Sequence, residues 1–231
     1  MRKADLYASI IFTLLLVCFL LCKATISGVY LSVTAEHPYL MAFVKFAILA
    51  TFGEMLALRI KSGVYYRNEF GIFPKMVVWG LLGIWIAFAM NVFAEGTPFI
   101  IEQIGLHGLI AAMNEPFSGL KLLGAFCISA MMNTSFAPVF MTVHKITDIH
   151  IQQHHGHLKS LIIPIKVKNI LSVMDWKTQW DFVFKRTIPL FWIPAHTITF
   201  ILPANFRVLF AALLSVALGL ILSIASLKSA N

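Results

Sequence analysis

A few polar side chains inside long apolar runs are the residues whose types and positions could do chemistry. Glu54 is an acid within the apolar run 39–60. An ionised group inside a membrane costs about 2.5–3.5 kcal/mol or more, so such residues are functional candidates by default. Two interpretations stay open for Glu54. It either belongs to a solute pathway or forms an interfacial ion pair with Arg59 or Lys61 at the basic end of its run.

Asn133 and Pro138 are candidates in a later apolar run, 120–143. An amide inside a membrane helix usually makes an interhelical hydrogen bond, worth roughly 0.6 kcal/mol on average. Because Asn133 is close to a proline, it is also a candidate for lining a cavity. We therefore predict either packing or a pathway role for it.

The run 188–202 is punctuated by proline and has one polar face. The residues concerned are Pro189, Pro194, Pro203, His196, Thr197 and Thr199. Proline lacks the N–H that closes a helical turn, so this run predicts a kinked fifth helix with carbonyl groups freed inside the membrane. We expect the threonine hydroxyls and His196 to be the nearest donors, and we take Pro194 and His196 as gating candidates.

Asn205 and Arg207 follow this run and are further pathway candidates. Arg207 lies on the side that is otherwise poor in positive charge. We expect Glu95, Glu102, a lipid phosphate or an anionic solute to neutralise it. A structural cap or a lipid contact is the alternative role.

His150, His154 and His157 are weak candidates for a metal site, because imidazoles at i and i+4 can share a metal. They have no accompanying Cys or Glu, which favours a protonatable basic loop at an anionic membrane surface. We therefore expect no metal and no cofactor. The sequence shows no phosphate-binding loop, nucleophile elbow or zinc-protease signature, so we predict no catalytic residues and no enzyme.

These candidates sit in a chain whose composition is that of a membrane protein. Of 231 residues, 59% are hydrophobic and 12% are charged, against roughly 45–50% and about 25% in soluble domains. Most apolar runs have about the 17–25 residues that a spanning helix needs. The fold class predicted is all-α, a polytopic transmembrane bundle of about four to six spans. The runs are 6–22, 39–60, 73–93, 120–143, 188–202 and 208–227.

The net charge of +8 is explained by topology. Most Lys and Arg residues lie in alternate segments, at the N-terminus, in 59–75, in 145–186 and at Lys228, whereas 32–38 and 94–119 contain acids but no Lys or Arg. By the positive-inside rule this predicts six crossings with both termini on the cytoplasmic or equivalent side. Binding to nucleic acid is not expected.

The organisation of the chain is predicted as an extra N-terminal hydrophobic helix, 1–29, followed by a bundle, 30–231. We prefer a retained first helix to a cleaved secretory signal, since no clear cleavage site follows. The three cysteines, Cys18, Cys22 and Cys127, are interpreted as buried apolar thiols. An apolar piece at 99–110, bounded by Pro98 and Pro116, predicts an interfacial or re-entrant helix.

Three different short motifs follow one another between residues 30 and 226. The first is His37-Pro38, followed by a hydrophobic run and Gly53-Glu54, and the second is Phe136-Ala137-Pro138. The third is Pro203-x-x-Phe206-Arg207, followed by a helix that ends in Leu222-Ser223. In the order and spacing of these motifs, the chain resembles the Mpv/PMP family, as a distant homologue would. This family contains the peroxisomal membrane protein PMP and the mitochondrial inner-membrane protein Mpv. Glu54 stands where that family usually has Asp, and Met132-Asn133 where it has Asp-Gln.

The resemblance implies a helical bundle of four membrane spans, which are the second, third, fourth and sixth apolar runs. It also implies a role in the passage of small solutes. We therefore expect a channel-like pore or transport protein for a small hydrophilic solute, gated by the fifth helix. The alternative is a non-transporting structural or lipid-interacting membrane protein. The partner expected in either case is the lipid bilayer, with oligomer formation left open. The default location is a plasma or bacterial inner membrane, with an organelle membrane as the alternative.

Overall fold

The computed structural model describes residues 23–228, with side chains for 28–221, and this described part is helical without a strand. The first apolar run, with Cys18, Cys22 and the choice between a retained helix and a cleaved signal, lies outside the described residues. The chain divides into two compact units, Met1–Met41 and Ala42–Asn231. The division falls twelve positions beyond the boundary predicted at residue 29.

The first unit contains helix α2 (Lys23–Glu36) and the start of α3 (Pro38–Ser62). One residue, His37, interrupts the helix between them. The proline that follows explains this local break, because a residue before proline is pushed out of the helical region while proline itself fits a first helical turn. The His37-Pro38 pair is therefore a helix boundary.

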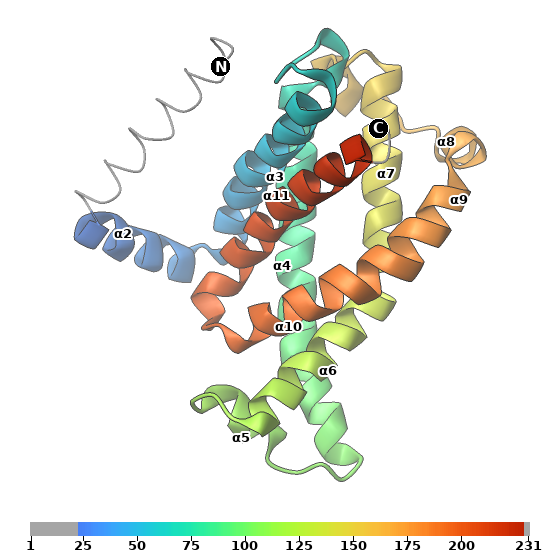
Figure 1. Cartoon of the computed structure of the whole chain (residues 1–231). Helices are drawn as coiled ribbons and strands as arrows, with labels where there is room; N and C mark the ends of the chain where they lie inside the picture. The colour runs from blue at the N-terminus through green and yellow to red at the C-terminus, as the bar shows by residue number, and fades with distance from the viewer. Residues whose placement is uncertain (1–22, 229–231) are drawn as a thin grey trace. The chain divides into compact units, whose positions relative to one another are not determined.

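The second unit holds the rest of α3 and all later elements. Its two longest helices after α3 are α4 (Ile72–Gln103) and α11 (Ala204–Lys228). The others are η1 (Asn68–Phe70), α5 (Leu109–Asn114), α6 (Gly119–Ser135), α7 (Ala137–Gln153), η2 (Leu158–Leu161), α8 (Val167–Val173), α9 (Trp176–Thr178), the π-helix η3 (Gln179–Trp192) and α10 (Ile193–Ile201). Helix α4 contacts α6, α7 and α11, and α10 packs along α6 (Figure 1).

Three described helices are long and apolar enough to cross a membrane, and the number rises to four if one bent pair is a single span. The three lie in α3, α4 and α11, and the pair is α6 with α7, bent by 47° at Phe136. The chain is thus a helical membrane protein. The fifth run lies in η3 and α10 and is not among the described helices that are long and apolar enough to cross a membrane. The prediction of six crossings also needs the first run, which lies outside the described residues.

The prediction of a separate interfacial helix at 99–110 is wrong. Helix α4 continues through Pro98 to Gln103, and only the short α5 follows. Pro98 removes one backbone hydrogen bond, and the 32 residues of α4 retain the others. At about 1.5 Å per residue this helix is about 48 Å long, more than a hydrocarbon core of about 30 Å. The helix is therefore longer than the apolar zone is thick.

The proline-rich run forms two successive helices whose prolines occupy different positions. Pro189 lies inside the π-helix η3, Pro194 lies in the first turn of α10, and Pro203 lies between α10 and α11. The prediction that the threonine hydroxyls bind carbonyls freed by proline is wrong. Thr197 Oγ1 donates to Ile193 O, four residues earlier, at 2.8 Å. Thr199 Oγ1 likewise donates to Ala195 O at 2.9 Å.

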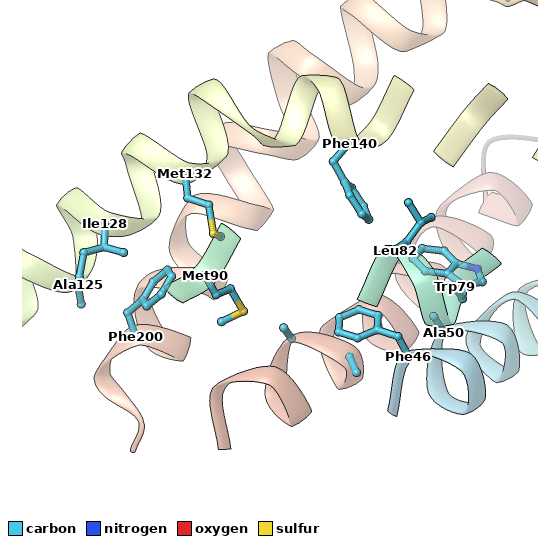
Figure 2. Close-up of a cluster of buried hydrophobic side chains, with 12 residues drawn as sticks. Phe46, Ala50, Trp79, Leu82, Met90, Ala125, Ile128, Met132, Phe140 and Phe200 are labelled. Atoms are coloured by element: carbon cyan, nitrogen blue, oxygen red, sulfur yellow. The ribbon is translucent and has the colours of Figure 1, made fainter. Parts of the chain in front are cut away.

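The core of the second unit lies where α3, α4, α6, α7, α10 and α11 meet, and Figure 2 shows its large side chains. Small residues bring the helices together, as is usual in membranes. A Cβ placed on Gly53 of α3 would lie 2.9 Å from the Cα of Val216 in α11. Gly80 and Gly83 of α4 similarly lie against Phe43 and Phe46 of α3. The glycines therefore set how closely α3 approaches its neighbours.

Candidate functional site

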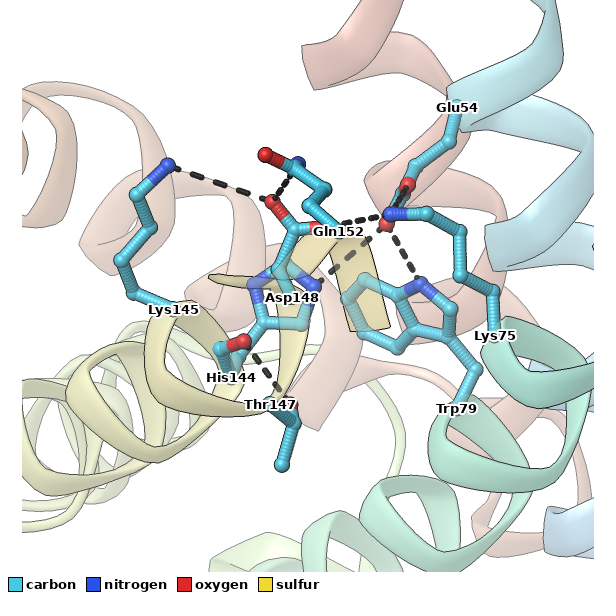
Figure 3. A network of polar contacts seen from close by, with 8 residues as sticks. All are labelled: Glu54, Lys75, Trp79, His144, Lys145, Thr147, Asp148 and Gln152. Carbon is cyan, nitrogen blue, oxygen red and sulfur yellow. Dashed lines mark hydrogen bonds and ion pairs between the residues drawn. The ribbon is translucent and has the colours of Figure 1, made fainter. Parts of the chain in front are cut away.

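A partly buried network of charged and polar side chains joins three helices of the second unit (Figure 3). Glu54 comes from α3, Lys75 and Trp79 from α4, and His144 and Asp148 from α7. Lys75 and Trp79 are four positions apart in the sequence, and so are His144 and Asp148. Because residues at i and i+4 lie on the same helix face, α4 and α7 each present two network members to Glu54.

Glu54 is contacted by a member of each of the other two helices. Its Oε2 lies 2.5 Å from the Lys75 ammonium, and its Oε1 accepts a hydrogen bond of 2.7 Å from Trp79 Nε1. The Nε2 of His144 lies 3.4 Å from the same Oε1. A charge-assisted hydrogen bond is roughly twice as strong as a neutral one, so these contacts stabilise an ionised Glu54.

Lys75 also donates to the second carboxylate, that of Asp148. The other oxygen of Asp148 accepts a hydrogen bond of 2.9 Å from Gln152 Nε2 and lies 3.9 Å from the ammonium of Lys145. Lys75 is 6% exposed and Asp148 15%, whereas Lys145 is 45% exposed. The inner part of the network thus consists of two carboxylates sharing one buried ammonium.

This geometry corrects part of the prediction for Glu54. The residue faces the bundle interior, and its ion partner is Lys75 rather than Arg59 or Lys61. Lys75 had been counted with the basic loop charges, yet it is buried within the first turns of α4. Sequence reasoning also missed Trp79, His144 and Asp148. Both pairs, Lys75 with Trp79 and His144 with Asp148, lie at the end of an apolar run. Their spacing of four residues, which puts each pair on one helix face, was the signal in the sequence that could have identified them.

A second buried polar cluster joins α6 to α10. The amide nitrogen of Asn133 donates to Ser129 O at 2.8 Å and lies 3.0 Å from His196 Nδ1. The Ser129 hydroxyl donates to Ile193 O at 2.7 Å. Asn133, His196 and Ser129 are all buried. The structure therefore brings together two of the predicted candidates, Asn133 and His196, through the interhelical hydrogen bond expected of a membrane amide.

A cavity of about 280 Å³ connects the two polar clusters. Glu54, His144 and Asp148 line it, as do Asn133 and His196. Most of the remaining wall is apolar or aromatic: Phe46, Ala50, Gly53, Ala57, Trp79, Ile86, Met132, Phe136, Ala137, Phe140, Met141, Trp192, Ala211, Leu218 and Gly219, with the hydroxyl of Ser215. The volume is near the lower end of the range of about 300–1,000 Å³ found for small-molecule sites.

A polar depression of about 380 Å³ lies on the other side of the charged network. Glu54 and Asp148 line both this depression and the cavity. Lys61, Arg67 and Lys75 line the depression and are not among the residues that line the cavity. The network of Glu54, Lys75 and Asp148 therefore separates a mostly apolar interior without lysine or arginine from a depression lined by both basic and acidic residues.

The other predicted site residues lie away from the cavity wall. Pro138 is in the first turn of α7, just after the bend at Phe136, and Pro194 is in the first turn of α10. Asn205 lies in the first turn of α11. The sequence predicts a pathway role for these residues alongside Glu54, but none of them is among the residues that line the cavity. The structure places them at helix starts instead.

Arg207 is held by groups near its own position in the chain. Its Nε donates to Leu202 O at 3.0 Å, and its guanidinium lies 5.8 Å from the centre of the Phe200 ring. Of the two acids considered as its partners, Glu95 interacts with it electrostatically. Glu102 instead accepts a hydrogen bond of 2.8 Å from the Ile110 N–H. This arrangement agrees with a cap for the α10 C-terminus.

His150, His154 and His157 do not come together as metal ligands, and no group of ligands that could hold a metal ion is found among the described residues. His150 is buried, and its Nε2 lies 2.9 Å from Ser160 O. His154 Nδ1 lies 2.8 Å from His150 O. Hydrogen bonds to backbone carbonyls thus occupy one ring nitrogen of each of these two histidines.

His157 does not join the other two rings. It is exposed in the loop just before η2, and its backbone N–H donates to His154 O at 3.1 Å. Its ring lies edge-on to that of His155, with ring centres 6.5 Å apart. Helix α7 ends at Gln153, so His157 is no longer on the helix face that would align it with His150 and His154. The three histidines connect the end of α7 to the following loop, which is a structural role.

No protein-family model, curated protein or solved structure matches the chain. The resemblance to the Mpv/PMP family therefore rests on the motifs quoted above.

Proposed function

We propose that this membrane protein lets small solutes pass through its helical bundle, with the Glu54–Lys75–Asp148 network as the barrier. The observation that carries the proposal is that Glu54 and Asp148 line both the internal cavity and the polar depression. A solute moving between these two spaces has to pass the network. The fifth helix, which we expected to be the gate, contributes Trp192 and His196 to the cavity wall.

The chemistry of the barrier supports this role. A buried ion pair holds its geometry while both partners are present, but loss of either partner leaves an uncompensated charge. Separation of Lys75 from the carboxylates would therefore be a discrete event rather than a gradual loosening. The network joins α3, α4 and α7, so this event would occur through a change of the Lys75 side chain or a movement of one helix relative to the others. The Mpv/PMP resemblance points to the same class of function.

One observation favours the second candidate, a structural or lipid-interacting membrane protein. The cavity wall is mostly apolar, and the polar side chains of both clusters already satisfy one another across helices. In that case the clusters would serve only to hold α3, α4, α6, α7 and α10 together. The two candidates differ in whether solutes cross the bundle.

Flux from liposomes distinguishes the candidates. The purified protein is reconstituted in vesicles, and release of small solutes of increasing size is followed, with uncharged and charged solutes at each size. We expect flux with a sharp size limit, and faster flux in Glu54→Gln, because the neutral amide attracts Lys75 less strongly. Asp181→Asn is the matched control, since Asp181 pairs with Lys185 on the exposed surface. Absence of flux at every size, in well-folded wild type and Glu54→Gln alike, would favour the structural candidate.

A further inference from the structure

The cavity wall carries two carboxylates but no lysine or arginine, and its basic side chains are the imidazoles of His144 and His196. Glu54 and Asp148 line it, whereas the lysine that pairs with both lines the depression on the other side. Each carboxylate has roughly four lone-pair sites. Glu54 uses three contacts, to Lys75, Trp79 and His144. Asp148 uses contacts to Lys75, Gln152 and the exposed Lys145. Acceptor capacity therefore remains for a donor inside the cavity.

Aromatic rings surround this acidic end of the cavity. Trp79 donates to Glu54, and the Trp79 and His144 ring centres lie 4.4 Å apart. Phe46 stacks on Trp79 with ring centres 6.5 Å apart, and both line the cavity together with Phe140. Figure 2 shows Phe46, Trp79 and Phe140 in the same part of the core. Ring faces attract cations, most strongly when water is excluded.

These two features point to the same chemical class. Carboxylates beside aromatic faces bind an organic ammonium group, while the apolar wall beyond them accepts a hydrocarbon body. A hydrated metal ion fits less well, because the described residues contain no group of metal ligands and the apolar wall cannot replace lost water. An anion would face Glu54 and Asp148 at close range.

We propose that the cavity binds a small amphipathic organic cation, with its ammonium group beside Glu54 and the rings of Phe46 and Trp79. Its apolar body lies towards Met132 and Phe136, which line the cavity from α6 and the bend that follows it. The inference names the solute class of the proposed function and rests on it for movement of the ligand. Binding is measured separately from flux, so either can fail alone.

Calorimetric titration of the full chain in phosphatidylcholine nanodiscs tests the inference. The probes are benzyltrimethylammonium, benzyl alcohol as an uncharged aromatic, and benzenesulfonate as an anion. We expect the cation to bind about tenfold or more tightly than the alcohol, and the anion not to bind. Equal affinity for cation and alcohol, or tighter binding of the anion, would overturn the inference.

Two variants locate the site. Glu54→Gln removes one carboxylate charge, and Phe46→Leu removes an aromatic face without altering any charge. Each should weaken binding of the cation several-fold while leaving benzyl alcohol nearly unaffected. Phe88→Leu is the matched control, because Phe88 lies on α4 and is 55% exposed. If Glu54→Gln does not fold, Phe46→Leu decides, and unchanged cation affinity in that variant would contradict the proposed site. Binding without flux would contradict the proposed function alone.

Discussion

The ammonium of Lys75 lies 2.5 Å from Oε2 of Glu54, although the two residues are on different helices and Lys75 is almost fully buried. The same ammonium donates to Asp148. One cation therefore holds two carboxylates in the bundle interior. Removal of the Lys75 ammonium should therefore lower the free energy of unfolding more than removal of a surface charge does.

Lys75→Met should strongly destabilise the protein. Without the ammonium, Glu54 and Asp148 would be partly buried carboxylates, 24% and 15% exposed, with no buried cation between them. Breaking a fully buried pair costs about 3–5 kcal/mol, and we expect a loss towards the lower end of this range. Lys185→Met is the control, because Lys185 is 57% exposed in its pair with Asp181 and such pairs contribute about 0–1 kcal/mol. Unfolding in mixed micelles, followed by near-ultraviolet circular dichroism, measures the difference. Similar losses in the two variants would show that the network contributes little stability.

Part of this fold could be predicted from apolar run length alone. The runs 39–60, 73–93 and 208–227 lie within α3, α4 and α11, because lipid exposure demands long apolar helices. Pro98 was misleading, since proline only weakens a helix whose remaining backbone bonds and apolar contacts persist. The length of α4 was therefore underestimated from its sequence.

The charged network could be predicted only in part. Glu54 stands out because it interrupts an apolar run, but its partners are 21 and 90 positions away in the chain. Those separations are set by how α3, α4 and α7 pack, which run length does not report. Lys75 looks like a loop charge because it lies close to the start of its helix. Burial by neighbouring helices, rather than local sequence, makes it a site residue.

Asn133 and His196 should show a measurable coupling energy. Their side chains lie 3.0 Å apart between α6 and α10. Such hydrogen bonds in membrane proteins average about 0.6 kcal/mol and reach about 1.7 kcal/mol. A double-mutant cycle with Asn133→Ala and His196→Ala should give a value in this range. A second cycle, which pairs Thr134→Val with His196→Ala, is the control and should give a coupling energy near zero. Thr134 is exposed, and its hydroxyl donates only within its own helix. A coupling energy near zero between Asn133 and His196 would contradict the interhelical bond.

The loops at residues 67 and 159 should lie on one side of the membrane, opposite residue 102. Gly71 and Gly156 are so close that a Cβ on Gly71 would lie 2.8 Å from the Gly156 Cα. Glu102 lies at the far end of α4 from Gly71. Single cysteines at Arg67 and Lys159 should therefore react with an impermeant maleimide only from the inner side, and at Glu102 only from outside. Opposite labelling of the Arg67 and Lys159 variants would contradict the loop contact.

Gly53→Ala should destabilise the bundle even though alanine favours a helix. In an open helix position this replacement gains up to about 1 kcal/mol. At Gly53, however, the new Cβ would lie 2.9 Å from the Val216 backbone, which cannot move aside as a flexible side chain would. Overpacking of this kind costs about 1–3 kcal/mol, so the clash should outweigh the gain.

Gly96→Ala is the matched control for Gly53→Ala, because Gly96 lies within α4 and a Cβ there would meet nothing within 4 Å. We expect this variant to be at least as stable as the wild type, and Gly53→Ala to be less stable. Thermal melting of both variants in the same detergent gives the comparison. Because Gly53 also lines the cavity, separation of α3 from α11 should enlarge the space beside Glu54. Equal stabilisation of the two variants would show that α3 and α11 do not approach closely at Gly53.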